Sequence, residues 1–341
     1  MTPANRVPVI ALTGYLGAGK TSLLNHLLLA PGARLGVVVN DFGVLNVDAA
    51  LVTGQIDKPV SISGGCLCCM PSGGGLDEAL EKLSQPTLRL DAILVEASGV
   101  ANPPVLAKLI RSSAVERIRP GGVIEVIDAV EHFRTVDAWP EPPLRYAAAT
   151  LVVIGKTDLL PSDEREAMVE RIHRRVRERN PCAPIVVARD GQIDPALVFD
   201  TASKDEPQDE LPIGLPLREE AHDHVGHEHA RSASVQLGEP VAPGALMDLL
   251  EEPPEGAYRM KGRVRVRGPR GERGYLVNVV GPMIHIMALA EPPEVGELVA
   301  IGLHLDAVSA ERALQAVADA HVDHVDAHGW GRLQRHRRLS E

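Results

Sequence analysis

The sequence predicts an α/β protein in which a parallel sheet is covered by helices on both faces, followed by a smaller α+β domain. Short apolar runs rich in β-branched residues alternate with helical patterns through residues 7–188, as in buried parallel sheets. From residue 203, acidic residues, prolines and histidines replace the apolar periodicity, and further strand and helix patterns follow. We therefore expect a first domain over residues 1–203, a linker over 204–232, a second domain over 233–336 and a tail over 337–341.

Each expected element follows from its local pattern. In the first domain, we expect strands over residues 7–13, 34–40, 88–96, 123–128, 151–155 and 184–188, and helices over 21–29, 76–83 and 162–179. In the second, we expect strands over 233–237, 258–267, 274–280, 284–289 and 298–303, and helices over 243–252 and 309–320. Residues 332–341 are expected to form a frayed tail.

Composition disfavours nucleic-acid partners. The formal charge is −11 and aromatic residues make up 3% of the 341 residues, whereas nucleic-acid surfaces are usually basic and often present aromatic rings. Basic residues do alternate along one expected strand, which is interpreted as a solvated face in preference to a binding surface. These residues are Arg259, Lys261, Arg263, Arg265 and Arg267.

The sequence also predicts a cytoplasmic protein without a membrane partner. No stretch approaches the roughly 18–20 apolar residues that span a bilayer. Residues 1–9 lack the charged start and long apolar run of a signal peptide. Three of the four cysteines are crowded together, which suits metal binding in a reducing compartment better than a disulfide framework.

Residues 14–21 read Gly-Tyr-Leu-Gly-Ala-Gly-Lys-Thr and match the phosphate-loop pattern in full. The loop follows an expected strand and opens an expected helix, which is the context that the motif requires. Lys20 is expected to reach the β- and γ-phosphates, and the Thr21 hydroxyl to bind Mg²⁺. The residues expected to hold the nucleotide here are Gly14, Gly17, Ala18, Gly19, Lys20, Thr21 and Ser22.

Two further segments complete the expected nucleotide site. Glu96 ends a buried strand, where a carboxylate can orient a Mg²⁺-bound water, and Gly99 lets the backbone approach the γ-phosphate. Lys156 and Asp158 follow another strand; the aspartate can accept the paired donors of guanine, which favours GTP. Gly155 stands where standard GTPases carry Asn, so one specificity contact is missing.

Two clusters are candidate sites for a transition metal. Cys66, Cys68 and Cys69 offer three soft ligands suited to Zn²⁺; the alternative is a set of buried small apolar side chains. A second cluster is interleaved with acidic residues and could bind metal weakly, although it could also be a polar loop without that role. Its members are His222, His224, His227 and His229.

In combination, these motifs resemble the CobW-type metallochaperone GTPases, relatives of UreG and HypB. The matching segments are residues 14–21, 40–43, 65–69, 96–99 and 155–158, with residues 258–262 and 301–302 in the second domain. The resemblance spans nearly the whole chain. It implies slow Mg²⁺-dependent GTP hydrolysis, zinc or cobalt at the cysteine motif, and delivery of the metal to a client protein.

The resemblance also implies that residues 40–43 lie in a switch segment, where Asp41 could contact a shared metal. Asp41 replaces the usual Glu, Val44 replaces an often acidic residue, and Gly155 replaces the usual Asn. We expect Lys20, Thr21, Glu96 and Asp41 to act in catalysis. A metal buffer with a vestigial nucleotide site and a small-molecule kinase using ATP are the alternatives, and a homodimer is left open.

Overall fold

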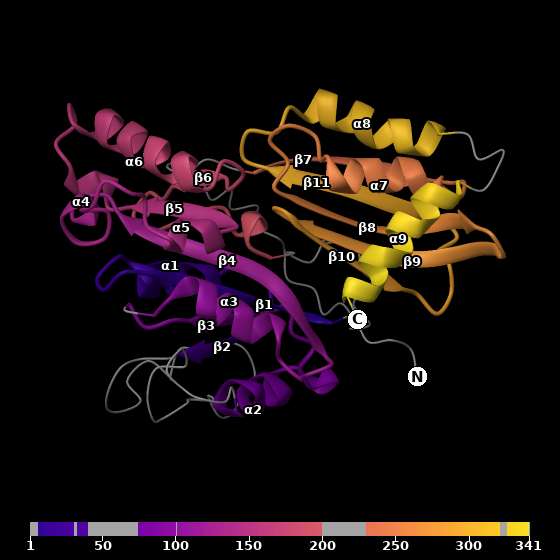
Figure 1. Cartoon of the computed structure of the whole chain (residues 1–341), viewed down its shortest axis with the longest axis horizontal. Coiled ribbons are helices and arrows are strands. Elements are labelled where there is room, and N and C mark those ends of the chain that lie inside the picture. The colour runs from indigo at the N-terminus through magenta and orange to yellow at the C-terminus, as the bar shows by residue number, and fades with distance from the viewer. Residues whose placement is uncertain are drawn as a thin grey trace, which may run out of the picture.

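The computed structural model describes residues 6–30, 33–39, 74–99, 101–199, 230–320 and 326–340. Two sheets organise these residues and lie side by side, each with its own helices (Figure 1). The first contains β1 to β6 and the second β7 to β11. Within the described segments, no helix is both long enough and apolar enough to cross a membrane.

The first sheet is parallel throughout and has the strand order β2-β3-β1-β4-β5-β6. Its strands are β1 (Val7–Gly14), β2 (Leu35–Val39), β3 (Ala92–Glu96), β4 (Ile118–Asp128), β5 (Leu151–Gly155) and β6 (Ile185–Val187). Because the strands run the same way, their carboxyl ends share one edge of the sheet. This edge carries the loop after β1 and the ends of β3, β4 and β5.

Helices cover both faces of this sheet. Ile10 and Leu12 of β1 pack with α1 on one face, whereas Val9 and Ala11 pack with α2 and α3 on the other, as the period of two along a strand requires. The helices are α1 (Lys20–Leu28), α2 (Gly74–Leu83), α3 (Pro103–Arg111), α4 (His132–Thr135), α5 (Arg145–Ala148) and α6 (Arg165–Arg179). Short 3₁₀ turns are η2 (Pro86–Leu88), η3 (Thr157–Leu159) and η4 (Pro195–Leu197).

The second sheet is antiparallel, in the order β10-β9-β8-β11-β7. Its strands are β7 (Arg231–Leu237), β8 (Arg259–Gly268), β9 (Gly271–Val280), β10 (Met283–Ala288) and β11 (Gly296–Gly302). Its helices are α7 (Pro243–Glu251), α8 (Ala307–Asp319) and α9 (Ala327–Ser340). α8 packs against β7, α9 against β10, and α7 against both of these helices, which encloses a separate apolar core.

The two domains share buried contacts at the amino-terminal end of β5. Thr150, just before β5, and Tyr258, just before β8, share a hydrogen bond of 3.3 Å between their buried hydroxyls. Tyr258 and Val280 also belong to the apolar cluster that contains α1 of the first domain. The second domain is thus packed onto the first through apolar and polar contacts.

The structure confirms the expected fold class and corrects several elements. Residues 88–91 are not strand: η2 begins at Pro86, and Arg89 adopts a left-handed backbone with φ 48° before β3 starts at Ala92. β4 begins five residues earlier than expected, at Ile118, because its start pairs with Val7 and Pro8 of β1. The helices α3, α4 and α5 were not anticipated.

The expected frayed tail over residues 332–341 is wrong for its described part. Helix α9 continues to Ser340, and Leu333 is fully buried in the core of the second domain. Arg332 forms ion pairs with Asp248 and Glu251 of α7. The basic, polar composition of this segment suggested a tail, but the buried Leu333 packs the helix into the second domain. The domain boundaries at residues 203 and 233 stay a prediction.

Candidate nucleotide-binding site

The phosphate loop connects β1 to α1 and depends on three glycines with positive φ. Gly14 has φ 151°, Gly17 has φ 78° and Gly19 has φ 98°. At Gly14 there is also no room for a side chain, because an added Cβ would lie 2.6 Å from the carbonyl oxygen of Val126 on β4. The loop therefore adopts a backbone that other residues would strain, and it is packed against the neighbouring strand.

Lys20 begins α1 and its side chain folds over the loop. Its Nζ donates to the carbonyl oxygens of Gly14 at 3.0 Å and Tyr15 at 3.2 Å, and the residue is 8% exposed. The ammonium group is thus held at the mouth of a loop that precedes a helix N-terminus, where backbone N–H groups favour anions. The role of Lys20 at the β- and γ-phosphates stays a prediction, and its position beside the loop is compatible with it.

Thr21 and Glu96 join the start of α1 to the carboxyl end of β3. The hydroxyl of Thr21 donates to Glu96 Oε1 at 2.9 Å, and Glu96 is 7% exposed. A hydroxyl and a carboxylate are hard oxygen donors of the kind that Mg²⁺ prefers, so these residues fit a magnesium site beside the phosphate loop. Gly99 supports the same region: an added Cβ there would lie 2.6 Å from the backbone of Leu16.

The end of β5 faces the same edge of the sheet. Lys156 has φ 61°, and its Nζ forms a 2.7 Å ion pair with Asp128 Oδ2 at the end of β4. The other oxygen of Asp128 accepts from the backbone N–H groups of Val130 and Glu131. The ends of β4 and β5 are therefore cross-linked. Asp158 is exposed in the turn η3.

A cavity of about 240 Å³ adjoins the phosphate loop, lined by Tyr15, Leu16 and Gly17 together with the end of β4 and the start of α4. Its buried carboxylate is Glu125, which accepts from Thr13 Oγ1 at 2.6 Å and pairs with Arg145 at 2.5 Å. Burial raises the pKa of Glu125, against the lowering effect of Arg145 and Thr13. This carboxyl group, bonded to Thr13 and Arg145 behind the loop, is not part of the phosphate-loop motif.

His132 lines the same cavity and begins a buried polar chain. It hydrogen-bonds the Tyr146 hydroxyl, which donates to Asp137 at 3.1 Å, and Arg175 binds both oxygens of Asp137. Burial lowers the pKa of His132 to about 4, so its imidazole is neutral at pH 7. Burial and Asp137 raise the pKa of Tyr146. The chain fixes α4, α5 and α6 relative to one another beside the site.

Sequence reasoning missed Glu125, Asp128 and the chain from His132 to Arg175. The sequence did contain an indication for Glu125, which is a carboxylate in an otherwise apolar strand. Burial of a carboxylate costs free energy unless the group is paired, so a partner could have been expected. The partner, Arg145, lies on the separate helix α5, so the sequence alone did not indicate the pair. Asp128 was recognised as a strand end, without the role of holding Lys156.

The structure brings together many of the predicted residues. These residues lie at or just after the carboxyl ends of β1, β3 and β5, along one edge of the parallel sheet: Gly14 to Ser22, Glu96, Gly99, Lys156 and Asp158. Other predicted residues lie outside the described part of the chain: Asp41, Cys66, Cys68, Cys69, His222, His224, His227 and His229. Among the described residues, no group of three or more His, Cys, Asp or Glu side chains is arranged to hold a metal ion.

The fold and the loop define the class: a nucleotide-binding protein with a parallel P-loop domain and a second, antiparallel-sheet domain. Residues 8–186 match the CobW/HypB/UreG nucleotide-binding domain, and residues 230–318 match the cobalamin synthesis protein CobW C-terminal domain. The chain belongs to the CobW/HypB/UreG family. The family suspected from the motifs is therefore confirmed.

The similarity to known proteins covers about half of this chain in some cases and nearly all of it in others. The zinc chaperone YjiA of Escherichia coli (strain K12) is 30% identical over 203 residues, which cover 58% of this chain and 62% of YjiA. The zinc chaperone CobW of Sinorhizobium sp is 27% identical over 357 residues, covering 92% of this chain and 97% of that protein. The crystal structure of Zn(II)-bound YjiA GTPase from E. coli matches 92% of this chain and 99% of its own, with 23% identity and a TM-score of 0.41.

Proposed function

We propose that this chain is a GTPase that uses Mg²⁺ and couples hydrolysis of GTP to GDP and phosphate to the binding of zinc or cobalt and its delivery to a client protein. The observation that carries the nucleotide part is the hydrogen bond from Thr21 to Glu96 beside Lys20. It joins the phosphate loop to the strand-end carboxylate that phosphoryl transfer requires. Relatives named as zinc chaperones support the metal part.

In the proposed reaction, the protein mainly positions charge. Lys20 neutralises the β- and γ-phosphates, and loop N–H groups hold their oxygens. Thr21 and Glu96 would hold Mg²⁺, which supplies charge neutralisation between the two phosphates. Glu96, or Asp41 from the sequence, orients the attacking water. The bond from the γ-phosphorus to the bridging oxygen breaks as the water oxygen adds, the proton of the water passes to the released phosphate, and GDP leaves.

Recognition of guanine is assigned to Lys156 and Asp158. The exposed carboxylate of Asp158 can accept from the N1–H and the exocyclic amine of guanine, a donor pair that adenine lacks. Lys156 is held by Asp128, so its aliphatic stem lies in a defined place for packing against the base and ribose. These two residues favour GTP over ATP in the proposal.

In this proposal the zinc or cobalt ion is cargo, and its candidate ligands are the residues that the sequence predicts. Cys66, Cys68 and Cys69 supply thiolates, which favour zinc and other thiophilic ions, and Asp41 is the candidate that completes the set. The segment from His222 to His229 is proposed as a weaker capture site. A coordination shell that this chain leaves incomplete suits transfer of the metal better than its storage, because a ligand from the client protein can occupy the open position.

The decisive experiment measures phosphate release from Mg-GTP by the wild type and by Lys20→Ala. Lys82→Ala is the matched control, because Lys82 is exposed on α2 and pairs with Glu78. We expect Lys20→Ala to abolish release and Lys82→Ala to leave it unchanged. If wild type and Lys20→Ala release phosphate equally slowly at background rates, the GTPase proposal is wrong and the metal-buffer alternative is supported.

Coupling needs a separate test. Zinc is titrated into the wild type with and without a non-hydrolysable GTP analogue, and the analogue is titrated with and without zinc. Linkage requires the two affinities to change by the same factor. Unchanged affinities in both directions would contradict coupling. Replacement of Cys66, Cys68 and Cys69 by Ser should abolish tight zinc binding; retained affinity would move the site to the histidine segment.

A further inference from the structure

Two neighbouring cavities lie where the second domain meets the first. One, of about 340 Å³, lies among α3, β4, α5 and the turn that joins β9 to β10. The other, of about 360 Å³, continues along the start of β4 toward β10 and the end of α9. Ile110, Arg111, Pro120 and Met283 line both cavities, so the two adjoin, and together they are called the recess. Each has the volume of a typical small-molecule site.

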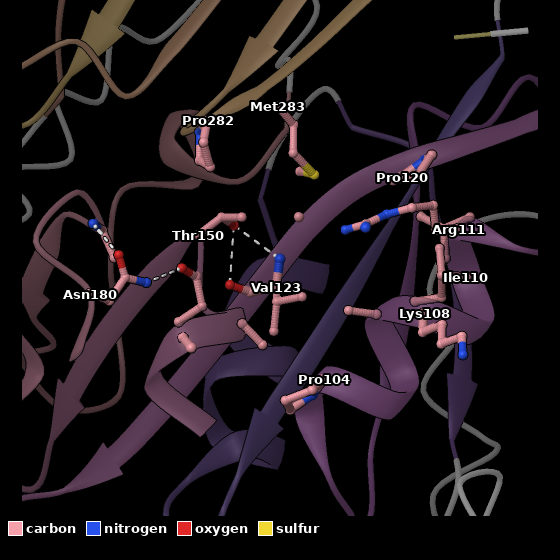
Figure 2. Close-up of a pocket in the computed structure, with 17 residues that line it drawn as sticks. Pro104, Lys108, Ile110, Arg111, Pro120, Val123, Thr150, Asn180, Pro282 and Met283 are labelled. Carbon is pink, nitrogen blue, oxygen red and sulfur yellow. Dashed lines mark hydrogen bonds between the residues drawn. The ribbon is translucent and has the colours of Figure 1, made fainter. Parts of the chain in front are cut away.

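The first cavity is walled by apolar groups from both domains, as Figure 2 shows. Among these, Pro282 and Met283 come from the second domain, and Val123 and Pro104 from the first. The neutral polar side chains that line this cavity, Thr150 and Asn180, already form hydrogen bonds within the protein. The Thr150 hydroxyl accepts from the backbone N–H of Val123 and donates to the carbonyl oxygen of Val123. The Asn180 amide donates to the carbonyl oxygens of residues 146 and 149. This compartment therefore suits an apolar group.

A cationic group projects into the recess from α3. In Figure 2 the guanidinium of Arg111 is directed inward from the helix, beneath Pro120 and Met283, whereas the ammonium of Lys108, one turn earlier, is directed away. Arg111 also lines the second cavity, so this residue lies where the two compartments adjoin. Arginine donates a pair of parallel N–H groups that match a carboxylate.

The second compartment is positive as a whole. Its charged lining residues are Arg6, Arg111, Arg119 and one carboxylate, Glu116. Arg6 and Arg119 already bond Ser340 and Asn278, and His285, which also lines the cavity, is neutral at pH 7. This positive lining is unusual in a chain with a formal charge of −11. Burial, together with the charges of Arg119 and Arg6, lowers the pKa of His285 to about 3, which is the direction that a positive local field produces. An anionic group is therefore favoured here.

We propose that this recess binds a small aliphatic carboxylate, with its hydrocarbon chain in the first cavity and its carboxylate on Arg111 at the entrance to the second. An apolar compartment adjoining a cationic one matches an amphiphile with one anionic end. Such a ligand touches both domains and so stabilises their contact. This site is separate from the phosphate loop, which lies at the opposite, carboxyl-terminal edge of the first sheet.

The test is calorimetric titration of the full chain with octanoate, below its micellar concentration. We expect one saturable site. Arg111→Gln should weaken it about ten-fold or more, as expected for a lost charge-assisted hydrogen bond. Lys82→Gln is the control and should stay within about two-fold, since Lys82 is an exposed lysine on α2 that lines neither cavity. Neutral 1-octanol should bind about ten-fold more weakly than octanoate.

Two further measurements keep the result independent of folding and of the nucleotide site. Circular dichroism and thermal unfolding should show that Arg111→Gln is folded like the wild type, since Arg111 is exposed. Lys20→Ala should bind octanoate like the wild type even if it loses GTP. The proposal is overturned if octanoate gives no saturable heat, if Arg111→Gln binds as well as the wild type, or if 1-octanol binds equally tightly.

Discussion

The hydroxyl of Thr21 lies 2.9 Å from Glu96 Oε1, so the first turn of α1 is hydrogen-bonded to the end of β3. The two residues are 75 positions apart in the chain. Their contact places a hydroxyl and a carboxylate beside Lys20, at the edge of the sheet where the phosphate loop lies. The proposed chemistry depends on this contact, and the first prediction tests it.

Glu96→Gln should lower Mg²⁺-dependent GTP hydrolysis by about 100-fold, because an amide cannot supply the charge that holds the metal and polarises the water. The measurement is the rate of phosphate release at several Mg²⁺ concentrations. Glu78→Gln is the control, since Glu78 is an exposed carboxylate on α2. A Glu96→Gln rate within two-fold of the wild type would assign the metal and water to another residue.

Gly155→Asn should increase the preference for GTP over ATP. An added Cβ would lie 3.7 Å from the Ala18 carbonyl oxygen and 3.8 Å from that of Ile127, which is ordinary contact, so a side chain fits. Its amide can then donate toward the loop and the base. We expect about a ten-fold gain in the ratio of GTP to ATP affinity, the value of one well-placed hydrogen bond.

Gly155→Ala is the control for the substitution at this position, because it fills the same space without the amide. Both variants are compared by competition between labelled GTP and unlabelled ATP. If Gly155→Asn and Gly155→Ala show the same ratio as the wild type, the end of β5 does not read the base in the way proposed.

The stability of the protein should fall as the pH drops from 6.5 toward 4, partly through His132. Burial holds the folded-state pKa of this histidine at about 4, below the ordinary value of 6.5, so the unfolded chain takes up its proton first. The contribution of His132 to the free energy of unfolding is nearly constant above pH 6.5 and is lost as the pH falls from 6.5 toward 4. Between pH 7.5 and pH 5.0 the loss is about 2 kcal/mol.

His132→Gln should therefore show about 2 kcal/mol less change in the free energy of unfolding between these two pH values. Urea denaturation at both pH values measures it. The exposed His328, replaced by Gln, is the control and should keep the wild-type difference. An identical pH dependence in the wild type and His132→Gln would mean that this histidine is not buried in its neutral form.

Leu333→Ala should destabilise the second domain by about 2–5 kcal/mol, the range for a fully buried leucine. Leu339→Ala, on the same helix, should change stability by less than about 0.5 kcal/mol, because Leu339 is 74% exposed. Chemical denaturation followed by circular dichroism compares the two. Equal, small effects would mean that α9 does not pack on the sheet as described.

Local patterns predicted the parallel sheet well because a strand buried on both faces is apolar along its whole length. They also predicted the phosphate loop, since its glycines, lysine and threonine lie within one short segment of the chain. They failed where one distant contact decides the structure. Residues 332–340 look like a polar tail, yet α9 is held by the buried Leu333 together with the ion pairs of Arg332 to α7. The start of β4 was missed because its pairing with β1, rather than its own composition, makes it a strand.

By itself, the sequence predicted the class of site: a loop with the phosphate-binding pattern, a strand-end carboxylate, and a turn proposed to recognise guanine. These depend on residue type and on spacing within short segments. Only the tertiary structure decided which groups meet. It paired Thr21 with Glu96, Asp128 with Lys156 and Glu125 with Arg145. Parallel strands bring distant segments to one edge, and no pattern along the chain encodes that proximity. The recess beside Arg111 arises in the same way, from the packing of one domain on the other.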